Sequence, residues 1–348
     1  MVKPTVLVIR LSAMGDVALS LPVISSIASD TGLIVVTRPL FTEFFRNIDN
    51  VRVISADTKG IHKGIPGLFR LCREIRAEFD IKQVIDLHDV IRSRLISFIF
   101  RFSGSKIYRI NKGRKEKRKF LRTRASEQLI HSADRYINVF RKAGFDWPGL
   151  QVPAFSFTNS ELSEAADYLL GIESGSKQKR VAFAPKARHA TKEWPAEHSK
   201  KLIKSLGREL NVRVYLFGAK DEREQLLELA EYDPSIIVVA GRFQLRSELA
   251  LLSMMDLMIS MDSSNMHLAA TAGVSTVSIW GGTHHKAGFG PAGNQAHIKI
   301  GIDTKELDCR PCTIYGKGDC KRSDLKFKCL VDISPERVIN EIKEAKIL

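Results

Sequence analysis

No run of about 18 consecutive uncharged apolar residues occurs in this chain, so no transmembrane helix is expected. The apolar stretch Val6–Ile9 is interrupted at once by Arg10, which makes it too short for the hydrophobic region of a signal peptide. That stretch predicts a first buried strand. We therefore expect a cytoplasmic protein, although a chain without a membrane span can still lie against a membrane surface.

The phosphate-binding signatures of dinucleotide-binding proteins and P-loop enzymes are also missing. The turn after the first strand carries a single glycine, Gly15, and no Gly-Lys-Ser/Thr sequence follows it. No Asp-x-Asp pair for a divalent metal occurs at the turns expected to face a ligand. Asp86 and Asp89 flank His88 with a different spacing, and we interpret the three as lining of a ligand cleft with a role toward an acceptor.

Acidic residues are outnumbered, 39 against 54 Lys and Arg, which gives a net charge of +15. The segment from Arg101 to Arg124 holds eleven basic residues and one acidic residue, Glu116. Such a run is either a solvated loop or a binding surface for an anionic partner, such as nucleic acid, a phosphorylated glycolipid or an anionic membrane. Because few aromatic residues interleave with the basic ones and no nucleic-acid motif occurs, nucleic acid is not predicted as a partner.

Cysteine is scarce, with five in the chain, and Cys72 lies alone in an apolar helical pattern typical of a core. The other four follow the pattern C-x2-C-x7-C-x8-C at Cys309, Cys312, Cys320 and Cys329. In a cytoplasmic protein disulfides are disfavoured, and four thiolates can hold zinc tetrahedrally. We expect a structural role for the four cysteines, either with zinc or without a metal.

Apolar runs alternate with amphipathic stretches along most of the chain, which predicts parallel sheets layered with helices. The strand–helix alternation restarts after the Pro- and Gly-containing segment 148–158. We predict an α/β protein with two Rossmann-like domains, residues 1–155 and 156–333, facing a central cleft. An amphipathic helix at residues 334–348 is expected to pack back on the N-terminal domain. Ligands of such sheets bind at the carboxyl ends of the strands.

Three strand-to-helix turns carry the candidate chemistry. The first contains Gly15 and Asp16; a helix cap at Ser20 would suit Pro22 and leave Asp16 available as a general base rather than as a cap. The second, 185–195, is dense in cations and includes Lys192, which suits a diphosphate. The third, 261–267, opens an apolar helix whose free N–H groups form a ready phosphate site.

These stretches resemble glycosyltransferase family nine, the ADP-heptose:lipopolysaccharide heptosyltransferases, whose fold is of the GT-B type. The matching segments are VLVIRLSAMGDVALSLPVISSI, ATKEWPAEHSKKLI, FGAKDE and DLMISMDSSNMHLAATAGVSTVSIWGGT. The resemblance spans both predicted domains, and the last segment is its most specific part. It implies an inverting, metal-independent transfer of a sugar from a nucleotide diphosphate donor.

The resemblance also implies roles for individual residues. Asp16 matches the family's catalytic base, and Lys192 and Glu222 match residues at the donor phosphates and ribose. The turn at the donor diphosphate and sugar is matched by Asp262, Ser263, Ser264 and His267. Two positions depart from the family pattern: Ser264 replaces a usual glycine, and GGTHH at 281–285 replaces a Gly-Pro-Thr pattern, which affects the expected sugar specificity.

The family's acceptors are phosphorylated lipid-linked saccharides at the inner face of the cytoplasmic membrane. The basic segment, read as a mobile arm on the N-terminal half, would attract both the acceptor and anionic lipid. The predicted acceptor-binding residues are Arg92, Arg94, Lys115, Lys117, Arg118 and Lys119. Two alternatives remain open at this point: a transferase or epimerase for a different nucleotide sugar, and a non-catalytic accessory protein that retains the fold.

Overall fold

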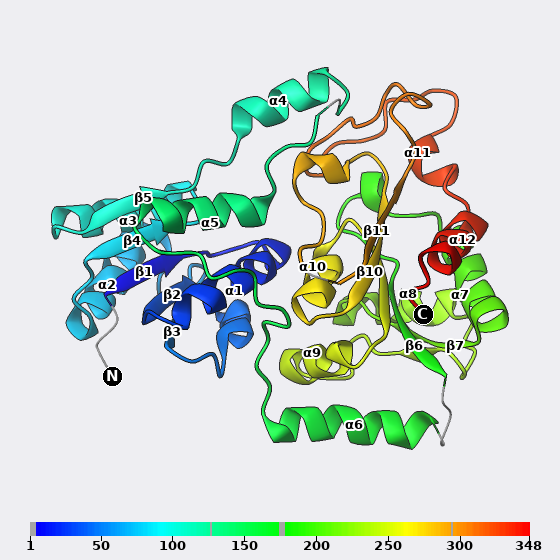
Figure 1. Cartoon of the computed structure of the whole chain (residues 1–348), viewed down its shortest axis with the longest axis horizontal. Coiled ribbons are helices and arrows are strands. Elements are labelled where there is room, and N and C mark those ends of the chain that lie inside the picture. Colours follow the sequence, from blue (N-terminus) through cyan, green and yellow to red (C-terminus); the bar gives the residue numbers. More distant parts are fainter. Residues whose placement is uncertain (1–4, 126, 174–177, 294) are drawn as a thin grey trace. The chain divides into compact units, whose positions relative to one another are not determined.

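The computed structural model describes residues 5–125, 127–173, 178–293 and 295–348 and divides into two compact units (Figure 1). Unit 1 consists of Met1–Gly113 and Ser132–Phe157, and unit 2 consists of Arg114–His131 and Thr158–Leu348. The main change of unit, at Phe157, lies close to the predicted boundary at residue 155. Residues 114–131 differ from the prediction, because the structure groups them with unit 2 and not with the N-terminal domain.

The described residues of unit 1 form a five-stranded parallel sheet in the order β3-β2-β1-β4-β5. Its strands are β1 (Val6–Ile9), β2 (Leu33–Thr37), β3 (Val51–Ser55), β4 (Gln83–Asp86) and β5 (Lys106–Arg109). Strands β1, β2 and β4 are apolar runs that are almost wholly buried, as expected for central strands covered on both faces. The chain reverses its direction of travel across the sheet after β3, so β1 and β4 are neighbours. This switch point places the turns after both strands at one edge.

Helices α2 (Gly64–Glu78) and α3 (Ile91–Phe102) pack together against one face of this sheet and form its main core with Leu7, Ile9 and Val84. Helices α1 (Met14–Ala28) and α5 (Ser132–Lys142) pack against each other. A 3₁₀ segment, η1 (Pro39–Phe45), follows β2. Helix α3 and strand β5 are absent from the strand and helix pattern that we derive from the sequence.

Unit 2 contains a six-stranded parallel sheet within its described residues, in the order β11-β10-β9-β6-β7-β8. Its strands are β6 (Lys179–Ala184), β7 (Val212–Leu216), β8 (Ile237–Val238), β9 (Leu257–Met261), β10 (Ser275–Trp280) and β11 (His297–Gly301). The two three-strand halves start side by side at β6 and β9, which is the doubly wound arrangement. The loops after β6, β7, β9 and β10 therefore emerge at the same edge of the sheet.

Unit 2 contains eight α-helices within its described residues. They are α4 (Arg114–Arg122), α6 (Asn159–Glu173), α7 (Ala196–Leu210), α8 (Arg223–Leu229), α9 (Leu245–Ser253), α10 (Ser264–Thr271), α11 (Lys328–Val331) and α12 (Pro335–Ala345), with 3₁₀ turns η2 (Ala190–Lys192), η3 (Lys220–Glu222) and η4 (His285–Ala287).

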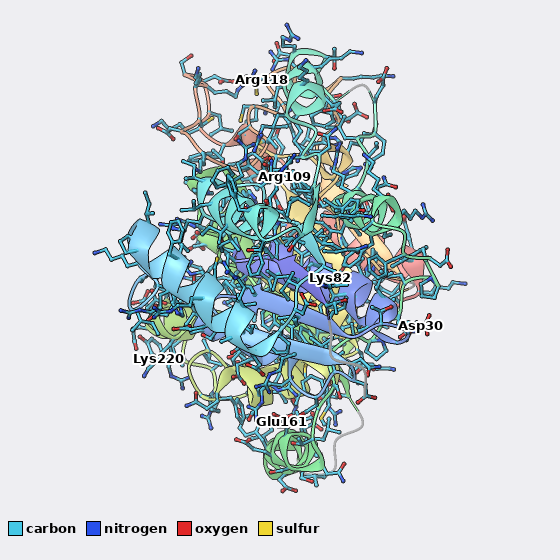
Figure 2. The ribbon with its side chains drawn as sticks, turned by 90° about the vertical axis from the view of Figure 1, so that its left-hand side faces the viewer. Asp30, Lys82, Arg109, Arg118, Glu161 and Lys220 are labelled. Atoms are coloured by element: carbon cyan, nitrogen blue, oxygen red, sulfur yellow. The ribbon has the colours of Figure 1, made fainter. Side chains whose placement is uncertain are left out.

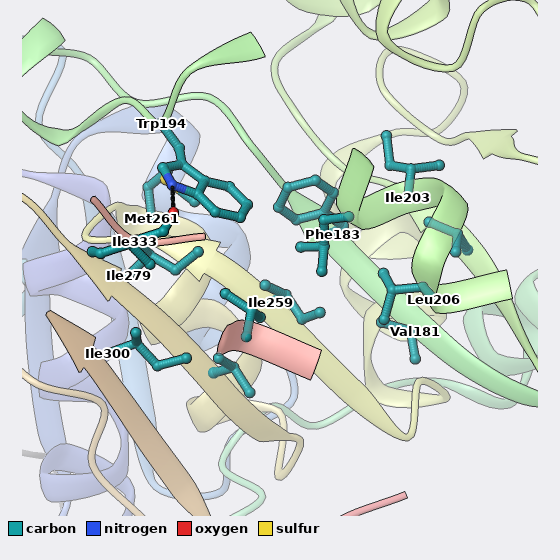
Figure 3. Packing of buried hydrophobic residues seen from close by; sticks show 14 of the residues in the cluster. Val181, Phe183, Trp194, Ile203, Leu206, Ile259, Met261, Ile279, Ile300 and Ile333 are labelled. Carbon is teal, nitrogen blue, oxygen red and sulfur yellow. Dashed lines mark hydrogen bonds between the residues drawn. The ribbon is translucent and has the colours of Figure 1, made fainter. Parts of the chain in front are cut away.

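Figure 3 shows the core on the α7 side, where Trp194 packs among aliphatic residues. Its indole N–H donates to the carbonyl of Ile333 at 3.0 Å and to that of Leu330 at 3.1 Å, so the aromatic ring is buried without an orphaned donor.

The C-terminal amphipathic helix is present, but its packing differs from the prediction. Ser334 caps α12 by accepting a hydrogen bond from the Arg337 N–H at 3.2 Å. The apolar side of the helix, with Val338, Ile339 and Ile342, packs on α7 and β11 inside unit 2 rather than on unit 1. No helix within the described part of the chain has the length and apolarity needed to cross a bilayer.

Candidate functional site

Asp16 lies at the carboxyl edge of the unit 1 sheet, in the first turn of α1. Its Oδ2 atom is 2.7 Å from Nη2 of Arg10, whose side chain is buried while that of Asp16 is 37% exposed. The Tyr136 hydroxyl donates weakly to Oδ1 at 3.5 Å. Burial acts to lower the pKa of Arg10, but Asp16, Tyr136 and Asp86 together outweigh it and the pKa is raised. The carboxylate is thus oriented by a permanently charged partner and still reaches solvent.

The helix that carries Asp16 begins at Met14, and Ser20 is not its cap, which corrects that part of the sequence interpretation. Pro22 sits inside the helix. Asp16 lies at the third helical position, where its Oδ2 accepts a long hydrogen bond of 3.5 Å from the Ala13 N–H. Asp16 therefore contributes to the cap of α1 and still reaches solvent. Its strong contact is to Arg10, and its hydrogen bond to the backbone is weak.

The Asp-Leu-His-Asp sequence after β4 is mainly structural. Asp86 is fully buried, and its carboxylate accepts from the backbone N–H groups of His88 and Asp89 at 2.9 and 2.8 Å and from the Ser93 hydroxyl at 3.0 Å. Asp89 is paired with Arg94 at 2.7 Å. Burial lowers the pKa of His88 to about 3, and nearby cations act in the same direction, so the ring is neutral at physiological pH. His88 approaches the Asp16 turn, with its Nε2 atom 3.4 Å from the Ser12 hydroxyl.

Lys192 and Asp262 form the central ion pair of unit 2, at the carboxyl edge of its sheet. Their Nζ and Oδ2 atoms are 2.7 Å apart, and the two side chains are only 15% and 8% exposed. Thr283, in the loop after β10, donates its hydroxyl to the same Oδ2 atom at 2.8 Å. Three loops that are far apart in the sequence thus meet at one buried carboxylate. A buried pair of this kind holds the ammonium group in a fixed position.

The turn after β9 leads directly from Asp262 into α10. Ser263 is at the N-cap position, but its side chain makes no capping hydrogen bond; its hydroxyl is 3.1 Å from that of Ser260 instead. The first-turn N–H groups of α10 are therefore left without a side-chain cap, which suits the binding of an anion at this helix end. Ser264 is the first residue of the helix, and His267 is buried one turn further on.

Glu222 lies at the same sheet edge, in η3 after β7. Its Oε2 atom accepts a hydrogen bond from the Ala219 N–H at 2.7 Å, which closes the turn. Gly218 leaves the space for this contact, since a Cβ atom there would stand 2.8 Å from Oε2. The predicted ribose-binding carboxylate therefore holds the shape of its own loop.

The cysteine-containing loop is connected to the loop that carries Lys192. Thr191 donates its hydroxyl to the Gly316 carbonyl at 2.6 Å and accepts at its own carbonyl from the Gly282 N–H at 2.8 Å. The Cys312 N–H donates to the Gly282 carbonyl at 3.0 Å. The buried Arg310 guanidinium adds hydrogen bonds to the carbonyls of Gly281 at 2.6 Å and Trp280 at 2.9 Å.

All four clustered cysteines are free thiols, and they come from a single loop region that ends in α11. They lie near enough to one another for their charges to interact, and burial raises the pKa of Cys329 to about 12. Among the described residues, no group of three or more His, Cys, Asp or Glu side chains is arranged to hold a metal ion. Zinc at these thiols stays a prediction, to be checked by metal analysis of the purified protein.

The six basic residues predicted to bind the acceptor are divided between the two units. Arg92 and Arg94 are exposed on α3 of unit 1, whereas the other four lie on α4, which belongs to unit 2. Lys117 is buried, with its Nζ 4.3 Å from the centre of the Phe289 ring and 5.6 Å from that of Tyr315. The expected mobile arm on the N-terminal half is thus a helix packed on unit 2, because it has an apolar and cation–π face of its own.

Lys115, Arg118 and Lys119, the remaining members of the predicted set, are exposed on the outer side of α4. Phe120 packs from its inner side against His284 with ring centres 6.3 Å apart. Two of the residues that hold the predicted groups in place, Arg10 and Thr283, stand outside the set derived from the sequence. Arg10 could have been found, since a cation directly after an apolar strand faces the same edge as the next turn. Thr283 gives no such signal, because its partner is 21 residues away.

The two doubly wound units, each with its polar groups at the carboxyl edge of a parallel sheet, define a glycosyltransferase of the GT-B class. Residues 68–315 match the family model described as glycosyltransferase family 9 (heptosyltransferase), and the chain belongs to that family.

Relatives of known name agree with this assignment. The chain is 25% identical over 277 residues to lipooligosaccharide heptosyltransferase 2 of Campylobacter jejuni, covering 76% of this chain and 79% of the relative. The fold is similar to that of a family 9 glycosyl transferase from Veillonella parvula, with a TM-score of 0.77, 23% identity and coverage of 99% and 97%. It is also similar to the heptosyltransferase WaaC of E. coli with ADP-2-deoxy-2-fluoro heptose, with a TM-score of 0.66, 18% identity and coverage of 98% and 99%.

Proposed function

We propose that this protein is an inverting heptosyltransferase that moves a heptose from ADP-heptose onto a phosphorylated lipid-linked saccharide in lipopolysaccharide core synthesis. We further propose that the reaction needs no divalent metal. The observation that carries the proposal is the buried Lys192–Asp262 pair beside the uncapped first turn of α10. A diphosphate needs such a combination of a fixed cation and oriented N–H groups. The fluorinated ADP-heptose bound in the WaaC structure supports the choice of donor.

On the acceptor side, Asp16 is the proposed general base. An acceptor hydroxyl attacks the anomeric carbon of the donor, and Asp16 takes up its proton as the new glycosidic bond forms. Because Arg10 holds Oδ2 at 2.7 Å, the carboxylate keeps one orientation during the reaction. A positioned carboxylate in this role contributes roughly 10²–10⁴-fold to the rate.

On the donor side, the bond from the anomeric carbon to the diphosphate breaks, and the electron pair leaves with ADP. Negative charge grows on the diphosphate, so groups that are already oriented toward it stabilise the transition state. Lys192 and the first-turn N–H groups of α10 are the proposed groups. They would supply the charge that a divalent metal supplies in other glycosyltransferases.

Calorimetric binding of ADP, UDP and GDP to the purified protein, first without and then with Mg²⁺, tests the proposal. We expect ADP to bind with preference over the other two, with equal affinity in the presence and absence of the metal. A transfer assay with ADP-heptose then follows. A strict requirement for Mg²⁺ would refute the metal-free reaction, and the absence of binding of all three nucleotides would favour a non-catalytic accessory protein.

A transferase for a different nucleotide sugar is the second candidate function. The residues of the loop after β10 are the observation that supports this candidate. This loop carries two histidines: His284 packs on Phe120, and His285 lies 6.1 Å from the Trp280 ring centre. Thr283 of the same loop contacts Asp262, so a change in loop sequence acts close to the proposed donor site. Preferential binding of UDP or GDP would select this candidate.

We also infer that the enzyme works as a peripheral protein at the inner face of the cytoplasmic membrane. A lipid-linked acceptor remains in the membrane while the nucleotide sugar is water-soluble, so the transfer has to occur at the interface. Separation of cell membranes from the soluble fraction, with a salt wash that releases the protein, is the direct test. Recovery of all of the protein in the soluble fraction at low salt would contradict the inference.

A further inference from the structure

Helix α3 carries a second apolar stripe on the side that is turned away from its core. Ile91, Phe98 and Phe102 follow the spacing that places side chains along one helix face, and Leu95 between them is partly buried against the core. Ile91 is 87% exposed and Phe102 is 79% exposed, and the Phe98 and Phe102 rings contact each other edge-on at 4.6 Å. An outer helix face of a soluble domain is usually polar, so large apolar residues in a row need an explanation.

The neighbouring helix α2 continues this surface. Ile65 and Phe69, one turn apart, are 62% and 52% exposed, and Ile61 in the preceding turn is 61% exposed. A groove of about 480 Å³ joins the two helices, with Ile65 and Ile91 both among its lining residues. In Figure 2, helix α2 of unit 1 lies nearest the viewer. Two helices thus contribute to one apolar face.

Cations surround this apolar face. Lys59, Lys63 and Arg92 line the same groove, and Arg101 lines a second pocket beside Phe98. In the part of the chain that the structure describes, no carboxylate lies within ion-pair distance of these four residues. Helix α3 itself contains no acidic residue. The face is therefore both apolar and positively charged.

We propose that this surface, the α2–α3 face, docks on an anionic phospholipid bilayer. The face consists of Ile61, Ile65, Phe69, Ile91, Phe98 and Phe102 together with Lys59, Lys63, Arg92 and Arg101. Apolar side chains inserted at the level of the headgroups, with cations beside lipid phosphates, are the two components of interfacial membrane binding. A water-soluble anionic ligand would match the cations but not the row of exposed aromatic and aliphatic side chains.

The inference rests on the proposed function in one respect, since a lipid-linked acceptor explains why the protein would need to reach a membrane. The exposed apolar residues and cations that support the docking do not depend on that function. The α2–α3 face also replaces the basic segment as the membrane contact, because α4 uses Lys117 and Phe120 for packing within unit 2. The α2–α3 face offers what α4 lacks on its outer side, namely large exposed apolar residues next to unpaired cations.

Co-sedimentation of the full-length protein with vesicles, in the absence of donor and acceptor, tests the docking. We expect binding to vesicles of phosphatidylglycerol and phosphatidylethanolamine, weaker binding to phosphatidylcholine vesicles, and a decrease with added salt. The double variant Phe98→Ser/Phe102→Ser should lose about tenfold or more in partitioning. The variant Arg92→Gln/Arg101→Gln should lose about fivefold per charge on anionic vesicles only.

Matched variants in unit 2 serve as controls. Leu170→Ser removes an apolar residue of α6 that is 75% exposed, and Lys201→Gln/Arg208→Gln removes two exposed charges of α7. Both should bind vesicles like the wild type. Circular dichroism melting and ADP calorimetry should show that the Phe98→Ser/Phe102→Ser protein is folded and binds nucleotide as before.

The proposal is overturned if the wild type does not bind anionic vesicles or if the Phe98→Ser/Phe102→Ser variant binds as well as the wild type. It is also overturned if light scattering shows that this variant dissociates a dimer while its vesicle binding is unchanged, since the face would then belong to a second copy. Vesicle binding without any nucleotide binding would leave the docking intact and refute the transferase. Transfer activity without vesicle binding would refute the docking and leave the proposed transferase intact.

Discussion

The carboxyl edge of unit 1 presents a half-exposed carboxylate, Asp16, while that of unit 2 presents a buried ion pair between Lys192 and Asp262. Both edges are produced by the same physics, parallel strands that end in turns at a switch point. The difference lies in what surrounds the charges. In unit 1 an arginine orients a carboxylate, the proposed base, that stays accessible to solvent, and in unit 2 three loops hold a cation at low exposure. This division suits proton uptake on one unit and phosphate binding on the other.

The two basic helices differ in a similar way. In α4 the apolar residue Phe120 and the stem of Lys117 face inward, so the exposed side is purely polar. In α3 one apolar stripe faces the core and another faces outward, flanked by arginines. A high density of positive charge therefore does not by itself identify a membrane contact; the distribution of apolar side chains between the inner and outer faces does.

The largest effect is expected at the base in unit 1. Asp16→Asn keeps the size of the side chain but cannot accept the proton, so kcat should fall by about 10²–10⁴-fold. The dissociation constant of ADP should be unchanged, because the groups proposed to bind the donor are on unit 2. Transfer kinetics and calorimetry measure the two quantities, with Asp30→Asn, an exposed change in the same unit (Figure 2), as the control. Equal turnover by the variant and the wild type would remove Asp16 from the reaction.

Removal of the cation in unit 2 should affect both donor binding and turnover. Lys192→Ala is expected to lower kcat by about 10²–10³-fold through loss of electrostatic stabilisation. It should also weaken ADP binding, in contrast to the change at Asp16. Lys201→Ala, on the exposed side of α7, is the matched control. If Lys192→Ala changed kcat and left ADP affinity as it was, the assignment of phosphate binding to this pair would have to be abandoned.

Two carboxyl groups, the fully buried Asp86 and the partly buried Glu248, extend the comparison of the two units to stability. Asp86 in unit 1 accepts several hydrogen bonds, whereas no donor in the described chain bonds the Glu248 carboxyl on α9, and burial raises its pKa to about 7. The folded protein therefore binds this proton more tightly than the unfolded chain, and stability falls as pH rises from about 4.5 to 7.

Glu248→Gln should remove that dependence. We expect the variant to gain about 1–2 kcal/mol in free energy of unfolding at pH 8, where the wild-type carboxyl is charged, and much less at pH 4. Urea denaturation at the two pH values measures the difference. A variant that is destabilised equally at both would show that the Glu248 side chain contributes packing or contacts that outweigh the cost of its charge.

The smallest effect is expected on the outer side of α4. Lys115→Gln/Arg118→Gln/Lys119→Gln removes three exposed charges without disturbing Lys117. If these residues attract the phosphorylated acceptor, its KM should rise about three- to fivefold, and the KM of the donor should not change. Arg92→Gln/Arg94→Gln on unit 1 gives the matched comparison. Equal changes in both Michaelis constants would exclude a specific role for α4 in acceptor binding.

The alternation of apolar and amphipathic segments determined both parallel sheets and most strand positions, because buried parallel strands are recognisable as short apolar runs. It also placed Asp16, Lys192 and Asp262 on the turns that end at the carboxyl edges. Local sequence missed α3 and β5. Helix α3 is apolar on two sides, which weakens the helical periodicity, and β5 is a short, partly exposed strand with a cation at each end.

The pairing of groups was decided only by the tertiary structure. Lys192 and Thr283 both contact Asp262 because three loops converge at one sheet edge, and no local pattern encodes contacts between segments this far apart in the sequence. The same holds for α4, whose assignment to unit 2 depends on Phe289 and Tyr315 far along the chain. The sequence determined which residues are charged, apolar and at the ends of strands. Packing determined which of them are neighbours and which face outward, because contact energies between distant segments are set only when the sheets and helices assemble.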